Sequence, residues 1–187
     1  MSKGFYGSMV MGLLALAAAA QDKDRVIAQF EGETYGEWTT EGTAFGNGPA
    51  KGTLPGQMKV SGFAGKGLVN SFLGGDGSTG TLTSPPFTVD RKHICFLIGG
   101  GGWAGKTCMN LLVDGKVVRT AVGPNTVPGG SEELDPGSWD VSELLGKKAQ
   151  IQIVDDQRGC WGHINVDQIV QSDAPPPAPL LNVTREL

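Results

Sequence analysis

The sequence has little of what several common classes of protein require. It contains two histidines and three cysteines among 187 residues, and the spacings of Cys95, Cys108 and Cys160 match no zinc-binding pattern. The formal net charge is −4 at pH 7 and there is no basic patch, so nucleic acid is not an expected partner. After residue 20 no segment is apolar enough to cross a bilayer, and none shows a sustained helical stripe.

Recognisable catalytic motifs are also missing. Neither His93 nor His163 lies in a nucleophile elbow or a triad context, and the glycine run at 99–102 lacks the Lys-Ser/Thr of a phosphate-binding loop. That run is either a tight turn or a set of backbone N–H groups open to a ligand. No catalytic residue is therefore assigned. An enzyme remains an alternative, because pairs of carboxylates could still approach one another: Glu31, Glu132, Asp155 and Asp167.

The odd number of cysteines leaves at least one thiol free in an exported protein. Cys95 and Cys108 flank the Gly-rich turn of a possible hairpin, so they are the pair that could form a disulfide. The alternative is that the cysteines are small buried side chains.

Both ends of the chain differ from its middle. Residues 1–20 have a lysine, an apolar run and four alanines in the order of a secretory signal, which predicts a secreted protein, extracellular or periplasmic. An uncleaved membrane anchor is the alternative, and the short apolar run disfavours it. Residues 173–187 form a proline-rich linker and eight further residues, which predicts a missing downstream domain; a frayed tail is the alternative.

What the chain does have is glycine, 30 residues, and proline, 11 residues, a composition typical of short strands joined by tight turns. Asp114-Gly115 is the strongest hairpin signal. We predict an all-β fold over residues 22–172, a two-sheet antiparallel β-sandwich that is jelly-roll-like. The predicted strands are 26–30, 37–45, 67–72, 81–84, 87–89, 94–98, 108–113, 116–122, 139–141, 149–155 and 164–170, with one helical turn at 142–145.

The segment 159–169 carries the clearest candidate for a ligand site. Apolar residues alternate there with His163, Asn165 and Asp167, so one strand face is apolar and the other carries polar groups. Trp161, which has Gly159 and Gly162 close by in the sequence, could serve as an aromatic platform. An aromatic face together with converging hydrogen-bonding groups is what a sugar requires of a protein.

A calcium site is a second possibility. Glu31 follows the first predicted strand and Asp167 lies in the last, and the terminal strands of a sandwich are often neighbours. Carboxylate oxygens are ligands that suit Ca²⁺. We therefore predict Glu31 and Asp167 as possible metal ligands.

Several motifs between Val26 and Ser172 resemble, in the same order, those of carbohydrate-binding module family 66. The most specific is the last, Trp161-Gly162-His163-Ile164-Asn165-Val166-Asp167. The others are Phe30-Glu31-Gly32, Tyr35-Gly36-Glu37-Trp38, Ala44-Phe45-Gly46, Gly65-Lys66-Gly67-Leu68-Val69-Asn70-Ser71, Gly80-Thr81-Leu82-Thr83-Ser84-Pro85-Pro86-Phe87, Ile98-Gly99-Gly100-Gly101, Val113-Asp114-Gly115-Lys116-Val117-Val118-Arg119 and Trp139-Asp140-Val141.

This resemblance implies a β-sandwich that binds the terminal fructose of levan or a similar fructan without cleaving it. Such modules are attached to levanases of glycoside hydrolase family 32, and residues 181–187 look like the opening of the segment that precedes such a catalytic domain. The Asp-Pro-Asn, Arg-Asp-Pro and Glu-Cys motifs of that domain are absent here. The implied partners are a fructan and a downstream family 32 catalytic domain. The alternatives are a fragment of a secreted levanase with its parent's activity, and a structural or adhesive sandwich without a sugar site.

The resemblance also implies ligand contacts at Arg119, Glu132, Asp155 and His163, in addition to the platform at Trp161. The chain departs from the family pattern at two places. Cys160 stands where the family usually has a glycine, and the loop 123–130 before Glu132 is long and interrupted by prolines. Either change could reshape the rim of the pocket.

Overall fold

Short segments with alternating apolar and polar residues fold as strands close to the predicted ranges. The computed structural model describes residues 24–174, so the predicted signal at 1–20 and the linker from residue 175 onward lie outside the described part. The strands are β1 (Arg25–Ala28), β2 (Thr39–Gly42), β3 (Val69–Asn70), β4 (Gly80–Thr83), β5 (Phe87–Thr88), β6 (His93–Gly100), β7 (Thr107–Val113), β8 (Lys116–Ala121), β9 (Asp135–Asp140), β10 (Lys148–Asp155) and β11 (Ile164–Ser172). One 3₁₀ turn, η1 (Ser142–Leu144), follows β9.

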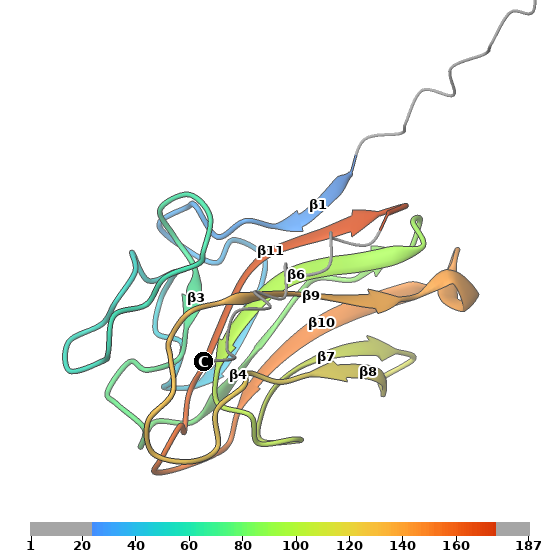
Figure 1. Ribbon diagram of the computed structural model, residues 1–187. Coiled ribbons are helices and arrows are strands. Elements are labelled where there is room, and N and C mark those ends of the chain that lie inside the picture. The colour runs from blue at the N-terminus through green and yellow to red at the C-terminus, as the bar shows by residue number, and fades with distance from the viewer. Residues whose placement is uncertain (1–23, 175–187) are drawn as a thin grey trace, which may run out of the picture.

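The strands form two sheets that face each other (Figure 1). One sheet has the order β1-β11-β6-β9, with β3 also paired to β11, and the other has the order β2-β4-β10-β7-β8, with β5 paired to β10. All these pairs are antiparallel. From β6 onward the chain crosses repeatedly between the sheets, which confirms the predicted jelly-roll-like β-sandwich. Among residues 24–174 there is no helix of the length and apolarity needed to cross a membrane.

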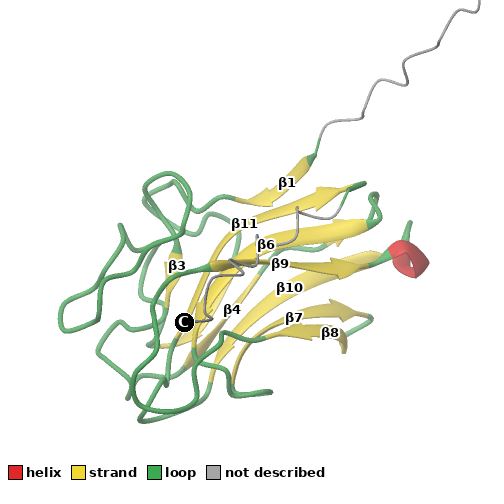
Figure 2. Ribbon diagram, viewed as in Figure 1, coloured by secondary structure: helices red, strands yellow, loops and turns green. Residues whose placement is uncertain are grey.

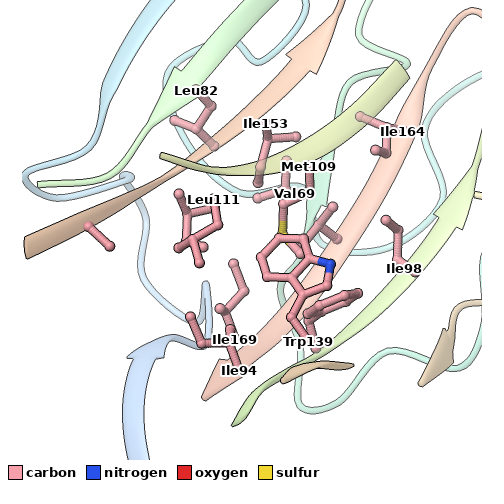
Figure 3. Close-up of a cluster of buried hydrophobic side chains, with 14 of the residues drawn as sticks. Val69, Leu82, Ile94, Ile98, Met109, Leu111, Trp139, Ile153, Ile164 and Ile169 are labelled. Atoms are coloured by element: carbon pink, nitrogen blue, oxygen red, sulfur yellow. The ribbon is translucent and has the colours of Figure 1, made fainter. Parts of the chain in front are cut away.

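The core lies between the sheets and is built from alternate residues of each strand. In β10, Ala149, Ile151 and Ile153 are buried, as the alternation predicts. Figure 3 shows the layer that they join: Leu82, Met109 and Leu111 from one sheet face Ile94, Ile98, Trp139, Ile164 and Ile169 from the other. Each fully buried isoleucine contributes about 2 kcal/mol of hydrophobic stabilisation.

Strand β11 departs from simple alternation at one point. Gln168 has a left-handed backbone, with φ of 50°, and the pairing of β11 with β6 shifts between Asp167 and Val170. This bulge inserts one residue, so Ile169 faces the core like Ile164 and Val166 despite its odd spacing from them. The residue after Asp167 therefore has a backbone conformation that few residues other than glycine adopt.

The long loops gather at one end of the sandwich, opposite η1 (Figure 2). Backbone hydrogen bonds tie these loops to one another: Gly159 N–H donates to Asp76 O (2.8 Å), Asp156 N–H to Lys106 O (2.7 Å) and Gly102 N–H to Asn125 O (2.7 Å). A small second core of Val60, Leu68 and Leu134 packs under the loop 50–68. This end therefore presents a set of loops held in fixed relative positions.

The glycine run 99–102 serves close packing. Gly101 N–H donates to His163 O at 2.7 Å and Gly102 N–H to Asn125 O at 2.7 Å, so neither group is open to a ligand. A Cβ atom on Gly101 would lie 2.1 Å from the Trp161 carbonyl oxygen. Glycine is required there because the chain before β11 passes too close for any side chain. Of the two alternatives for this run, N–H groups open to a ligand are excluded at these two positions.

The three cysteines are unpaired, and the predicted disulfide between Cys95 and Cys108 is not formed. Cys95 lies in β6 and Cys108 in β7, which belong to different sheets. Both are buried, as expected if the cysteines serve as small apolar side chains and not as a disulfide. Burial raises the pKa of both thiols. Cys160, in the loop between β10 and β11, is exposed.

One thiol of the three is expected to react with iodoacetamide in the native protein. Alkylation requires an accessible thiolate, and only Cys160 is exposed, whereas Cys95 and Cys108 are buried with raised pKa values. Mass spectrometry should show one adduct under native conditions and three after unfolding without reductant. A single adduct after unfolding would instead demonstrate a disulfide.

Candidate functional site

The polar face of β11 is covered, not open to solvent. His163, immediately before the strand, and Asn165 and Asp167 within it are all buried. Their polar side chains point away from the core toward the loops at the end of the sandwich, and β3 pairs with β11 beside them at Asn165 and Asn70. The sequence predicted the polar face correctly but not the loops that cover it.

A pocket of about 220 Å³ opens among these loops. Four parts of the chain line it: Gly56, Gln57 and Met58; Phe72 and Asp76; Pro128, Gly129 and Glu132; and Cys160, Trp161 and His163. The volume is below the range of about 300–1,000 Å³ that is usual for sites of drug-sized ligands. It therefore suits one small ring, not an extended molecule.

His163 is clamped between two carboxylates at the base of this pocket. Its Nδ1 lies 2.6 Å from Asp76 Oδ1, and its Nε2 lies 3.0 Å from both Glu132 carboxylate oxygens. Burial alone would lower the pKa of His163, but the hydrogen bonds and charges of Glu132 and Asp76 outweigh it and raise the pKa. An imidazole with an acceptor on each nitrogen favours the doubly protonated ring, which donates at both.

Glu132 is buried and fully engaged. Besides His163, its carboxylate accepts hydrogen bonds from Asn165 Nδ2 at 2.8 Å and Gln57 Nε2 at 3.3 Å. Gln57 is in turn held by Asn70, whose Nδ2 donates to Gln57 Oε1 at 2.8 Å. A buried carboxylate is tolerated only when its lone pairs are satisfied in this way. Glu132 therefore acts mainly by holding His163 and Gln57 in place.

Two aromatic rings hold the histidine from the sides. Phe72 packs edge-on, with ring centroids 4.9 Å apart and an interplanar angle of 76°, and Trp161 lies at 5.4 Å and 33°. The Trp161 indole N–H donates to the carbonyl oxygens of Val127 (2.9 Å) and Gly129 (3.0 Å). Trp161 has a left-handed backbone, with φ of 57°, at a cost on the order of 1 kcal/mol. The loop and the indole hydrogen bonds fix its ring as a wall of the pocket.

Of the five predicted ligand residues, the structure brings together Glu132, Trp161 and His163 at this pocket. Arg119 lies elsewhere: in β8 it forms an ion pair with Glu143 and donates to the Asp140 carbonyl oxygen from Nε (3.2 Å) and Nη2 (3.0 Å). It does not line the pocket.

Asp155 does not line the pocket either. It is completely buried at the end of β10, and neither carboxylate oxygen has a well-formed hydrogen bond. Its carboxylate is therefore not available at the rim of the sandwich. Burial raises the pKa of Asp155 to about 7, opposed only in part by the Ser71 hydroxyl, the Gln157 N–H and the charge of His163.

Glu31 and Asp167, the predicted metal ligands, meet at the loop 64–67. Glu31 accepts hydrogen bonds from Lys66 N–H (3.0 and 3.1 Å) and Gly67 N–H (3.3 Å), and Asp167 Oδ2 accepts from Ala64 N–H (2.8 Å). The Lys66 N–H is the main reason that the pKa of Glu31 is lowered, whereas burial raises the pKa of Asp167 to about 6. Among residues 24–174 no group of three or more His, Cys, Asp or Glu side chains is arranged to hold a metal. The two carboxylates are hard donors of the type that Ca²⁺ prefers, and carbonyl oxygens would have to complete its shell.

Sequence reasoning missed Asn70 in β3, and it missed Gln57, Phe72 and Asp76 in the loops on either side of that strand. Asp76 lies in the run Gly74 to Ser78, where an aspartate is an ordinary turn residue. It is 87 positions away from the histidine that it contacts. No local signal in the sequence distinguishes it from the other turn residues.

The chain is similar in sequence to a larger protein of Aspergillus rugulosus. The two are 46% identical over 136 residues, and the relative bears the name "Putative glycosyl hydrolase ecdE". The match covers 73% of this chain but only 19% of the relative, so this chain spans about a fifth of that protein. A scan against models of protein families finds no match.

Several solved structures are similar in fold at low identity. One is a cyclase from Fischerella sp. TAU, with a TM-score of 0.49 and 15% identity over 79% of this chain and 95% of that one. Another is the K2 adhesin domain of Lys-gingipain, with a TM-score of 0.49 and 17% identity over 80% of this chain and 97% of that one. A third is a family 35 carbohydrate-binding module from an environmental isolate, with a TM-score of 0.40 and 16% identity over 70% of this chain and 93% of that one. Similarity at this level says nothing about ligands, and the sandwich described above rests on its own strand pairing.

Proposed function

We propose that this domain is a non-catalytic carbohydrate-binding module that holds a terminal sugar in the pocket formed by Trp161, His163 and Asp76. The observation that supports this most is the clamped histidine beside a fixed indole. Sugars combine vicinal hydroxyls with an apolar C–H face, so they bind where charged hydrogen-bonding groups and an aromatic wall meet. The small volume of the pocket suits one sugar ring at the end of a chain.

The polymer that we propose is a fructan of the levan type, and the proposed partner is a family 32 catalytic domain. Support comes from the resemblance of the Trp161-to-Asp167 motif to carbohydrate-binding module family 66. A relative that is named a glycosyl hydrolase and is about five times longer than the matched segment fits a module within a larger enzyme. Secretion, suggested by residues 1–20, would place both where polysaccharide is found. The module would raise the local concentration of the enzyme on its polymer.

Affinity electrophoresis in gels that contain levan, inulin or an unrelated glycan tests this proposal. Retention by levan, with weaker or no retention by the others, is the expected result, and titration calorimetry should give a dissociation constant of roughly micromolar to millimolar. Arg119→Ala is the matched control on the sandwich: it removes a charged side chain outside the pocket, so retention should be unchanged. Loss of retention in Arg119→Ala would indicate that the binding site lies at β8 and not at the pocket. A flat titration with every glycan would favour a structural or adhesive domain.

An enzyme is the second candidate, since Asp76 and Glu132 place two carboxylates at one pocket. Both already bind His163, which leaves neither of them as an independent acid or base. Release of reducing sugar from levan by this chain alone, lost in Asp76→Asn, would replace the binding proposal with a hydrolytic one.

Calcium is expected to stabilise the domain through Glu31 and Asp167. At a concentration 100 times its dissociation constant, a bound ion adds about 2.7 kcal/mol, which raises the melting temperature of a domain of this size by about 5–10 °C. Calorimetric melting with Ca²⁺ and then with excess chelator measures the difference. Glu31→Gln should melt at the same temperature in both conditions. Equal melting temperatures for the unmodified protein would count against this site.

A further inference from the structure

Trp103 lies beside the pocket, in the loop that joins β6 to β7, and has no part in the site described above. Its side chain is half-buried, and the residues that follow it, 104–106, are exposed. Trp103 does not belong to either hydrophobic core cluster. A large aromatic side chain that is partly in water and outside the core needs another explanation.

The ring of Trp103 is held at a defined place beside the pocket. Its indole N–H donates to the carbonyl oxygen of Cys160 at 3.1 Å, and Cys160 itself lines the pocket. The Trp103 backbone is fixed as well, because its N–H donates to Thr107 Oγ1 (3.0 Å) and its carbonyl accepts from the N–H groups of Lys106 and Thr107. The hydrogen bond thus ties this second indole to Cys160, the residue that immediately precedes Trp161 in the chain.

The surface around Trp103 is open. A Cβ atom built on Gly105, two residues after the tryptophan, or on Gly159, next to Cys160, would meet no atom within 4 Å. Both glycines have left-handed backbones, with φ of 75° and 84°, so they form turns that carry no side chain over this surface. An extended ligand that leaves the pocket past Cys160 would therefore meet the indole of Trp103 without obstruction from these turns.

We infer that Trp103 forms a second sugar subsite, which stacks against the sugar unit next to the one in the pocket. This inference rests on the proposed function, because it requires a chain end in the pocket. The pocket is closed at its base by the buried pair of His163 and Glu132, so the rest of a polymer has to leave through the rim. An indole held by its own N–H exposes its ring to the C–H face of a sugar without losing side-chain entropy on binding. The domain would thus recognise two consecutive units of a chain.

Binding of fructose and of a levan-type trisaccharide to the unmodified protein and to Trp103→Ala tests the subsite. The unmodified protein should bind the trisaccharide about tenfold more tightly than fructose. Trp103→Ala should lose this tenfold advantage and keep its affinity for fructose within twofold. Trp103→Phe, which keeps an aromatic face, should retain most of the advantage, and Lys106→Ala, an exposed change in the same loop, should retain all of it.

Indole N–H signals in NMR spectra provide a second readout. The chain has four tryptophans, and Trp103→Phe identifies the signal of Trp103 by its absence. Fructose should shift the signal of Trp161 alone, whereas the trisaccharide should shift that of Trp103 as well. If fructose binds but the trisaccharide neither binds more tightly nor moves the Trp103 signal, the subsite is wrong and the pocket stands. If neither sugar binds the unmodified protein, both proposals fall.

Discussion

Replacing Glu132 by alanine is expected to reduce retention on levan at least a hundredfold and to destabilise the domain by about 3–5 kcal/mol. The change leaves two buried donors, His163 Nε2 and Asn165 Nδ2, without this acceptor, whereas the half-buried Gln57 Nε2 keeps Asn70 Oδ1. Removal of one partner from a buried, charged hydrogen-bonded network typically costs this much. Binding is lost for a second reason, because His163 would keep Asp76 as its only hydrogen-bond partner.

The adjacent residue provides a matched control for this variant. Glu133 is the same residue type in the same loop, but its side chain is exposed. Glu133→Ala should therefore retain levan binding and lose less than about 0.5 kcal/mol. Urea unfolding measures both changes, and affinity electrophoresis measures retention. A Glu132→Ala variant that unfolds and binds like the unmodified protein would show that the clamp on His163 is not the site.

Glu132→Gln separates the charge of this residue from its shape. The amide keeps the side-chain volume and one acceptor, so the domain should remain folded, but it removes the charge that raises the pKa of His163. We expect the pKa of His163 to fall and levan binding to weaken more steeply as the pH rises. NMR titration of the His163 ring protons reports this directly. An unchanged pKa would mean that Asp76 alone maintains the protonated ring.

The strands were predictable because their information is local. Alternation along β10 and β11, together with the Asp114-Gly115 turn, identifies core-facing residues without knowledge of the partner strands. The prediction was incomplete for β9, where only its last two residues lay in a predicted strand. Asp135 to Ser138 contains Asp, Pro and Gly, which are rare in strands, and pairs because β6 offers its backbone along that edge.

From the residues themselves, the candidate site was predictable mainly in the segment that leads into β11. His163 and Trp161 belong to the segment at β11, and their residue types in that spacing indicated a ligand site. Their partners Asp76 and Gln57 come from loops, and the position of a loop depends on contacts that are distant in sequence. Arg119 is a further example of what the sequence alone could not predict. Its strand could be predicted, but not that the side chain would pair with Glu143, away from the pocket.

The domain is expected to lose stability as the pH rises from about 4 to 7, and Asp155 is expected to cause the largest single part of this loss. In the unfolded chain an aspartate has a pKa of about 3.9, whereas burial raises the pKa of folded Asp155 to about 7. Between these values the unfolded state binds fewer protons than the folded state, so rising pH favours unfolding. A difference of roughly three pKa units corresponds to about 4 kcal/mol, fully present below pH 4 and lost by about pH 7.

Two other groups act in the same direction and have to be separated from Asp155. Burial raises the pKa of Asp167 to about 6, so its contribution is also lost between about pH 4 and 6. The raised pKa of His163 adds stability that is present below its unfolded value and lost as the pH rises through its folded value. A variant of Asp155 alone should therefore flatten the pH dependence of unfolding only in part.

Asp155→Asn makes this separation measurable, because an amide has the shape of a protonated carboxyl group and cannot ionise. At pH 4.5 the variant and the unmodified protein should unfold at similar urea concentrations, since Asp155 is protonated in the folded state at that pH. At pH 8 the variant should be the more stable by several kcal/mol, because the unmodified protein must hold a buried carboxylate near Asp76 without well-formed hydrogen bonds. Parallel loss of stability in the two proteins from pH 4.5 to 8 would show that Asp155 ionises as readily in the folded domain as in the unfolded chain.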